Sequence, residues 1–224
     1  MAEIFRKLDS ERFAVSMRDT ARAGNLNVIT VIQGVALGIL AINIHAGFFA
    51  PALIGDWLRW APYPLFCFGA LIIVTLDYFG HIATFERPAS GIELTIIFVL
   101  GLTEIAPMFF LNGNQGYFWF FEGMFFITAA GAWLNTLRYC TAEYFAEDMA
   151  RRNYVAVRQL EIGLAVLMAL GCFLVSYIAL NAGLSFLFEI IAIASLCFSG
   201  MALAALEQFI ILKLQKDHGF TSRW

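Results

Sequence analysis

The sequence predicts an all-α polytopic integral membrane protein with six transmembrane helices. Of its 224 residues, 61% are hydrophobic and only 14% are charged, and the mean hydropathy is +0.76. A soluble domain is about 45–50% apolar and about 25% charged, and the core of a chain of this size cannot hide such an excess. The apolar residues also fall into separate runs of about 20 residues, the length that crosses a bilayer.

Six apolar segments are long enough to span a membrane, and polar or proline-containing connections separate them. Their predicted ranges are 26–49, 65–85, 92–111, 117–137, 160–180 and 184–212. The last segment exceeds the length that a bilayer core needs, so we expect it to tilt or to project from the membrane.

Positive charges predict the orientation of these helices. With six spans, 13 of the 14 lysines and arginines fall on one side of the membrane, and Arg59 alone falls on the other. Cytoplasmic loops carry the excess of lysine and arginine in membrane proteins. Both termini are therefore expected in the cytoplasm, most simply at the inner membrane of a bacterial cell.

The remaining chain predicts little mass outside the lipid bilayer. Residues 1–25 are expected to form a cytoplasmic amphipathic arm, in which residues 10–23 form an interfacial helix that ends at Gly24. Residues 26–212 form the membrane domain, which includes a cytoplasmic helical connection at about 138–159 that extends the fourth or fifth span. Residues 213–224 form a cytoplasmic tail.

Acidic residues inside the predicted spans are the main functional signal. They are Asp77, Glu104, Glu122 and Glu189, with Glu93, Glu161 and Glu207 toward the inner ends of their spans, and no lysine or arginine lies within the six segments. An acidic side chain at the centre of a spanning helix costs about 2.5–3.5 kcal/mol on insertion scales. Each acid must therefore be protonated, hydrated or neutralised by a group outside the spans. If they converge, they form a ladder that binds cations or relays protons.

Glu104 lies beside two residues that predict a polar site at mid-membrane. Pro107 lacks the N–H that would bond the carbonyl group of Thr103, so it kinks the helix and frees an acceptor next to Glu104. The Thr103 hydroxyl adds a second polar group. Two interpretations remain open for Glu104: a protonated carboxyl bonded to a neighbouring helix, or a ligand on a translocation pathway.

Asp77 and His81 form a second candidate pair on the second span. They are four residues apart, so they share one face of a helix. A plain hydrogen bond between them is the simpler interpretation, and half of a metal or proton site is the alternative. No complete metal site is predicted from the spacing of His, Cys, Asp and Glu in the sequence.

Small residues predict close helix packing. Gly34 and Gly38 have the G-x-x-x-G spacing that allows helices to approach closely. This face is expected to pack either within the chain or against another copy or membrane subunit, and the sequence does not separate these roles.

These patterns favour transport over catalysis. No catalytic constellation, cofactor motif or phosphate loop occurs, and the net charge of −3 does not indicate nucleic-acid binding. We expect a channel or secondary transporter for a cation or proton, or for a small solute coupled to one, whose pathway includes Glu104, Asp77, Glu122, Glu189, His81 and Thr103. The alternative is a non-catalytic membrane subunit of a secretion or conjugation machine, or a pore-forming defence effector, whose buried acids pair with partner helices.

Overall fold

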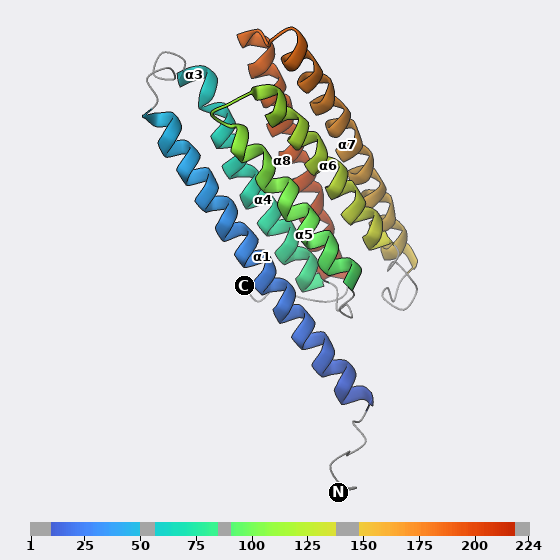
Figure 1. The fold of residues 1–224 in the computed structure, drawn as a ribbon. Coiled ribbons are helices and arrows are strands. Elements are labelled where there is room, and N and C mark those ends of the chain that lie inside the picture. The colour runs from blue at the N-terminus through green and yellow to red at the C-terminus, as the bar shows by residue number, and fades with distance from the viewer. Residues whose placement is uncertain (1–9, 50–56, 85–90, 138–147, 218–224) are drawn as a thin grey trace, which may run out of the picture.

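The computed structural model describes residues 10–49, 57–84, 91–137 and 148–217 of the chain. These residues form helices and a few turns, and no β-strand occurs among them. The elements labelled in Figure 1 and the helix between them are, in chain order, α1 (Ser10–Phe48), α3 (Trp57–Trp60), α4 (Pro62–Thr84), α5 (Gly91–Ile105), the 3-10 helix η1 (Ala106–Phe110), α6 (Gln115–Leu137), α7 (Asp148–Asn181) and α8 (Phe186–Asp217).

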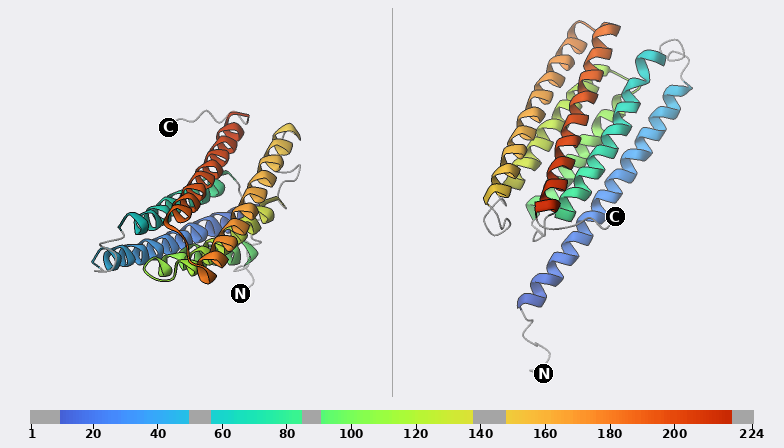
Figure 2. Two further views of the ribbon diagram at one scale, coloured as in Figure 1. Left: turned by 90° about the horizontal axis from the view of Figure 1, so that it is seen from above. Right: turned by 180° about the vertical axis from the view of Figure 1, so that it is seen from behind.

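The six long helices form a closed ring. Helix α1 contacts α4 and α5, and the chain of contacts continues from α5 to α6, from α6 to α7, from α7 to α8 and from α8 back to α4. Seen from behind in Figure 2, α4 and α8 lie in front of α5 and α6. Side chains that point inward from these helices therefore meet in a shared interior.

Four helical stretches are long and apolar enough to cross a membrane. They are Asn27–Phe48, Trp57–Thr75, Arg151–Asn181 and Phe186–Leu206. A shorter apolar helical stretch, Thr95–Phe110, lies between the second and the third of these. Helix α6 has 23 residues, which corresponds to about 35 Å at 1.5 Å per residue. The all-helical architecture is confirmed for the described residues. The third predicted span corresponds to the shorter helix α5 followed by η1.

The N-terminal segment differs from the prediction. Gly24 does not end a helix, because α1 runs without interruption from Ser10 to Phe48. Glycine inside a helix costs only about 1 kcal/mol relative to alanine, and a proline that would enforce a stop is missing from this stretch of the sequence. The start of α1 therefore continues the axis of the first span and extends beyond the ring in Figure 1.

The connection before the fifth span does extend that span. Residues 148–158 are the first turns of α7, which continues to Asn181 as one helix of 34 residues. Residues 138–147 of the predicted connection, residues 1–9 of the arm and residues 218–224 of the tail lie outside the described residues.

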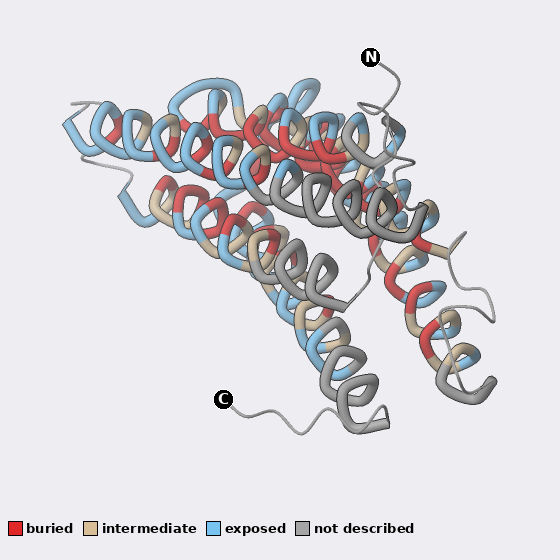
Figure 3. Tube along the Cα trace, turned by 90° about the horizontal axis from the view of Figure 1, so that it is seen from below, coloured by how far each residue is buried: buried red, intermediate tan, exposed pale blue. Residues whose placement is uncertain are grey.

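The outer surface of the ring is strongly apolar. Large apolar side chains are exposed on every long helix, among them Val31, Leu65, Leu102, Leu134, Leu167 and Phe198. Figure 3 shows this exposed surface along the outside of the helices and the buried residues between them. Water does not favour such a surface, whereas lipid chains do, so the exposure pattern fits association with a membrane.

Glycines set the closest helix contacts inside the ring. A Cβ atom added at Gly123 would lie 2.6 Å from the Phe173 ring, and one at Gly116 would lie 2.5 Å from the Leu180 side chain. These contacts bring α6 and α7 together. By contrast, a Cβ at Gly34 or Gly38 would meet nothing within 4 Å, so this face of α1 does not pack on the described part of the chain.

Candidate functional site

A buried hydrogen bond between Gln33 and Glu104 connects α1 to α5. The amide Nε2 of Gln33 lies 3.2 Å from Oε1 and 3.0 Å from Oε2 of Glu104, and it donates to the carboxyl group. Gln33 is 8% exposed and Glu104 is 5% exposed. Glu104 therefore faces the interior of the ring, and its partner is an amide from a neighbouring helix.

Pro107 lies where the α-helical geometry of α5 ends. Helix α5 ends at Ile105, and the chain continues as the 3-10 helix η1, with Pro107 in its first turn. A proline lacks the N–H that would continue the α-helical ladder, and the tighter 3-10 turn accommodates it. The hydroxyl of Thr103 lies 2.8 Å from the hydroxyl of Thr128 on α6, so Thr103 joins α5 to α6 there.

Glu122 of α6 lies in the interior close to Glu104. It is 4% exposed, and its carboxyl group makes no hydrogen bond with any residue that the structure describes. Glu104 and Glu122 are on either side of the turn between η1 and α6, each about seven residues from it, which corresponds to roughly 10–13 Å of helix. The two residues are thus at similar depth in the ring.

Three further helices of the ring carry buried or partly buried thiols. Cys67 on α4, Cys172 on α7 and Cys197 on α8 are each within electrostatic range of the Glu122 carboxyl group. No group of three or more metal-ligating side chains occurs among the described residues.

Glu189 is neutralised by a base from outside its own helix. It is 1% exposed in the first turn of α8. Arg59 of α3 approaches its Oε2 at 2.5 Å and also donates to the carbonyl of Leu184 at 3.0 Å. The hydroxyl of Tyr63 donates to the other carboxylate oxygen of Glu189. A buried acid can be protonated, hydrated or neutralised by a base. Arg59 neutralises Glu189 at the end of the ring where α3 lies.

Aromatic side chains lie between Glu189 and Glu122. The Tyr63 ring meets the Phe118 ring edge-on, with the centroids 4.8 Å apart, and its centroid is 6.3 Å from that of Trp119. Phe118 and Trp119 are each 1% exposed and occupy the α6 turn directly before Glu122. The interior at this level is therefore packed with rings.

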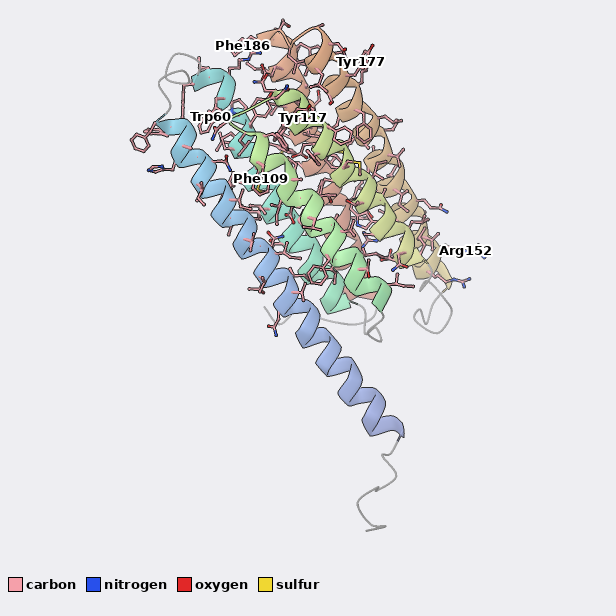
Figure 4. All side chains as sticks on the ribbon, viewed as in Figure 1. Trp60, Phe109, Tyr117, Arg152, Tyr177 and Phe186 are labelled. Atoms are coloured by element: carbon pink, nitrogen blue, oxygen red, sulfur yellow. The ribbon has the colours of Figure 1, made fainter. Side chains whose placement is uncertain are left out.

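Polar contacts join the end of α1, helix α3 and the turn before α6 at the end of the ring where Glu189 lies. Trp60 donates its Nε1–H to Oδ1 of Asn112 at 2.9 Å, and Asn112 donates to the carbonyl of Asn43 at 2.7 Å. A Cβ at Gly47 would lie 2.4 Å from the Trp60 ring. The end of α1, the turn before α6 and helix α3 are thus held together above the buried acids. In Figure 4, Trp60 and Tyr117 lie near this end, and Arg152 lies at the other.

The Asp77–His81 pair is located only by its backbone. Both residues lie in the second half of α4, and their side chains lie outside the described residues. Their spacing on one helix remains a prediction of a shared face, and neither of its two interpretations is tested.

One buried ion pair lies elsewhere, on α7. Nη1 of Arg158 lies 2.8 Å from Oε2 of Glu161, three residues further along the helix. Nε of Arg158 also donates to the Tyr154 hydroxyl at 2.9 Å. All three residues are at most 2% exposed. This pair joins neighbouring turns of one helix, so it does not belong to the central cluster.

Comparisons with known proteins do not assign the chain to a class. No protein-family model, curated protein or solved structure matches it.

Proposed function

We propose that the chain is a membrane translocation protein that moves a cation or proton, or a small solute coupled to one, past carboxyl groups inside its helical ring. The observation that carries this proposal is the position of Glu104 and Glu122. Both lie at similar depth inside the ring, and the only described hydrogen-bond partner of this pair is Gln33. Ionisable groups inside a membrane domain usually serve ion or proton pathways.

The same proposal includes six membrane-spanning helices with both termini in the cytoplasm. The long helices run alongside one another and present apolar side chains outward. Exposed aromatic residues, including Trp57, Tyr117 and Tyr177, lie toward the α3 end, as expected of a membrane interface. The arginines at the start of α7 lie at the other end (Figure 4). Reporter fusions at the two termini should both report the cytoplasm, and a reporter beside Asp56 should report the opposite side.

The assembly-subunit alternative is supported by the open face of α1. Gly34 and Gly38 are exposed and have no neighbour in the described part of the chain, so another helix has room to approach them. The buried acids do not support it, because Glu104 and Glu122 are enclosed by their own chain, where a partner arginine would not reach. If α1 joins subunits, Gly38→Leu should lower the native mass in detergent, whereas an unchanged mass would exclude this face.

Reconstitution of the purified chain in liposomes tests translocation directly. The chain should carry protons or cations in response to an applied gradient, and Glu104→Gln should strongly reduce that flux. Thr128→Val is the matched control, because it removes a polar contact between α5 and α6 without changing a carboxyl group. Equal flux in the two variants would count against the carboxyl pathway, and a stable partner that co-purifies with a chain lacking flux would support the alternative.

A further inference from the structure

We infer that the species bound at the centre of the ring is a proton, with Glu122 as its carrier and Glu104 as a fixed neighbouring group. This inference rests on the proposed translocation function and narrows its substrate class. It follows from three features of the interior: the groups around Glu122, the hydrogen bond that holds Glu104, and the aromatic packing between Glu122 and the α3 end.

The surroundings of Glu122 do not suit a dehydrated metal cation. Such cations require several oxygen ligands, about six to eight for Ca²⁺ and a comparable cage of carbonyl oxygens in a potassium filter. Among the described residues, no group of three or more His, Cys, Asp and Glu side chains comes close enough together to hold a metal ion. A proton needs only one carboxyl oxygen, and Glu122 supplies two that are free of hydrogen bonds to the described residues.

Gln33 distinguishes the two carboxyl groups. Its Nε2 contacts both oxygens of Glu104, so that side chain is held in one position by a donor from α1. Glu122 has no comparable restraint among the described residues, and its side chain can exchange a proton without breaking a hydrogen bond that the structure records. Glu122 is therefore the carrier, and Glu104 is a positioning residue that acts on it electrostatically.

The interior beyond Glu122 admits a proton more readily than a hydrated ion. Phe118 and Trp119 fill the preceding turn of α6, and Tyr63 packs against both. The Tyr63 hydroxyl already donates to Glu189, and the buried Nε1–H of Trp119 has no acceptor in hydrogen-bond geometry among the described residues. The Tyr63 hydroxyl, which can both donate and accept a hydrogen bond, is thus the polar group that lies within this packed layer on the side of Glu189.

The transfer step is balanced and needs no further reactant. A proton from one side forms an O–H bond with the Glu122 carboxylate. The same O–H bond breaks when the proton leaves to water on the other side, and the electron pair stays on the carboxylate oxygen. One proton crosses the membrane, and the side chain returns to its starting state.

Liposomes containing the full chain separate protons from other cations. Under a membrane potential set by potassium and valinomycin, an internal pH dye should report proton entry, and this entry should fall to the level of protein-free liposomes in Glu122→Gln. Glu122→Asp should retain part of the flux, because it keeps a carboxyl group. Sodium entry, measured with a sodium-sensitive dye in a matched preparation, should stay at the background level.

An infrared spectrum gives a second readout that does not depend on flux. The wild-type chain should show the carbonyl stretch of a protonated, buried carboxyl group, and this band should be lost in Glu122→Gln and kept in Thr128→Val. Its absence from the wild-type chain across the accessible pH range would overturn the proton inference. Sodium flux that depends on Glu122 without proton flux would also overturn it while leaving translocation intact. No ion flux at all would overturn the proposed translocation function itself.

Discussion

Gln33 on α1 holds Glu104 on α5 through a buried hydrogen bond in which one amide nitrogen contacts both carboxyl oxygens, at 3.2 and 3.0 Å. The two residues are 71 positions apart in the chain. This bond fixes how two helices of the ring meet, and it places the acid beside Glu122 in the interior.

Replacing the amide partner of Glu104 should destabilise the fold. Gln33→Leu leaves a buried carboxyl group without its donor, and such a loss costs about 1–3 kcal/mol. Denaturant titration in detergent micelles, followed by circular dichroism, measures the change. Gln159→Leu is the control, because Gln159 is exposed on α7 and its replacement should change stability by no more than about 0.5 kcal/mol. Equal effects of the two variants would contradict the assigned role of Gln33.

Arg59 and Glu189 should show strong energetic coupling. Arg59→Gln leaves Glu189, which is 1% exposed, without its base, while Arg59 itself is 31% exposed. Breaking a fully buried pair costs about 3–5 kcal/mol, and the partial exposure of Arg59 lowers our expectation to about 1–3 kcal/mol. The double variant Arg59→Gln/Glu189→Gln should recover much of this loss in a double-mutant cycle. Additive effects would show that the two side chains act independently.

Gly123 and Gly131 of α6 should respond in opposite ways to the same substitution. Gly123→Ala places a methyl group 2.6 Å from the Phe173 ring, and overpacking of this kind costs about 1–3 kcal/mol. A Cβ at Gly131 meets nothing within 4 Å, so Gly131→Ala should be neutral or stabilise the helix by up to about 1 kcal/mol. Thermal unfolding of both variants checks the difference. Phe173→Leu should partly rescue Gly123→Ala, and its failure to do so would contradict the proposed contact.

The thiols around Glu122 should report whether a wide aqueous pore exists. Cys67 is 2% exposed and Cys172 is 3% exposed, and a proton pathway does not require water to surround them. In a Cys140→Ser/Cys197→Ser background, a charged membrane-impermeant thiol reagent should leave both residues unmodified during proton flux, as measured by mass spectrometry. Both should react after denaturation. Rapid modification in the folded protein would instead indicate a water-filled pore.

The positions of the helices could be predicted from the sequence, but their arrangement could not. Long apolar runs bounded by polar turns indicate helices, and each predicted segment overlaps a helical stretch. Four of these stretches are long and apolar enough to cross a membrane. These helices are apolar on most faces, so periodicity does not say which face meets a neighbour. Gly24 shows a related limit: glycine is common after helix ends, but it is also tolerated within a helix when the flanking residues favour continuation.

The partners of the acids were harder to predict than the acids themselves. Glu104 and Glu122 stood out because a carboxyl group is costly in lipid, yet Gln33, Arg59 and Tyr63 gave weaker signals. Gln33 is one of three side-chain amides in the first predicted span, with Asn27 and Asn43, and Arg59 is the one lysine or arginine on its predicted side of the membrane. Arg59 and Glu189 are 130 residues apart in the chain, and only the closure of the helical ring brings them together.

Potential-driven proton entry into liposomes is the measurement that shows whether Glu122 carries the translocated proton. The initial rate should be measured for the wild-type chain, Glu122→Gln, Glu122→Asp and the control Thr128→Val, with each variant first shown to be folded by circular dichroism. The account predicts rapid entry for the wild-type and Thr128→Val chains, a lower rate for Glu122→Asp, and no entry above protein-free liposomes for Glu122→Gln. A folded Glu122→Gln chain that admits protons at the wild-type rate would contradict it.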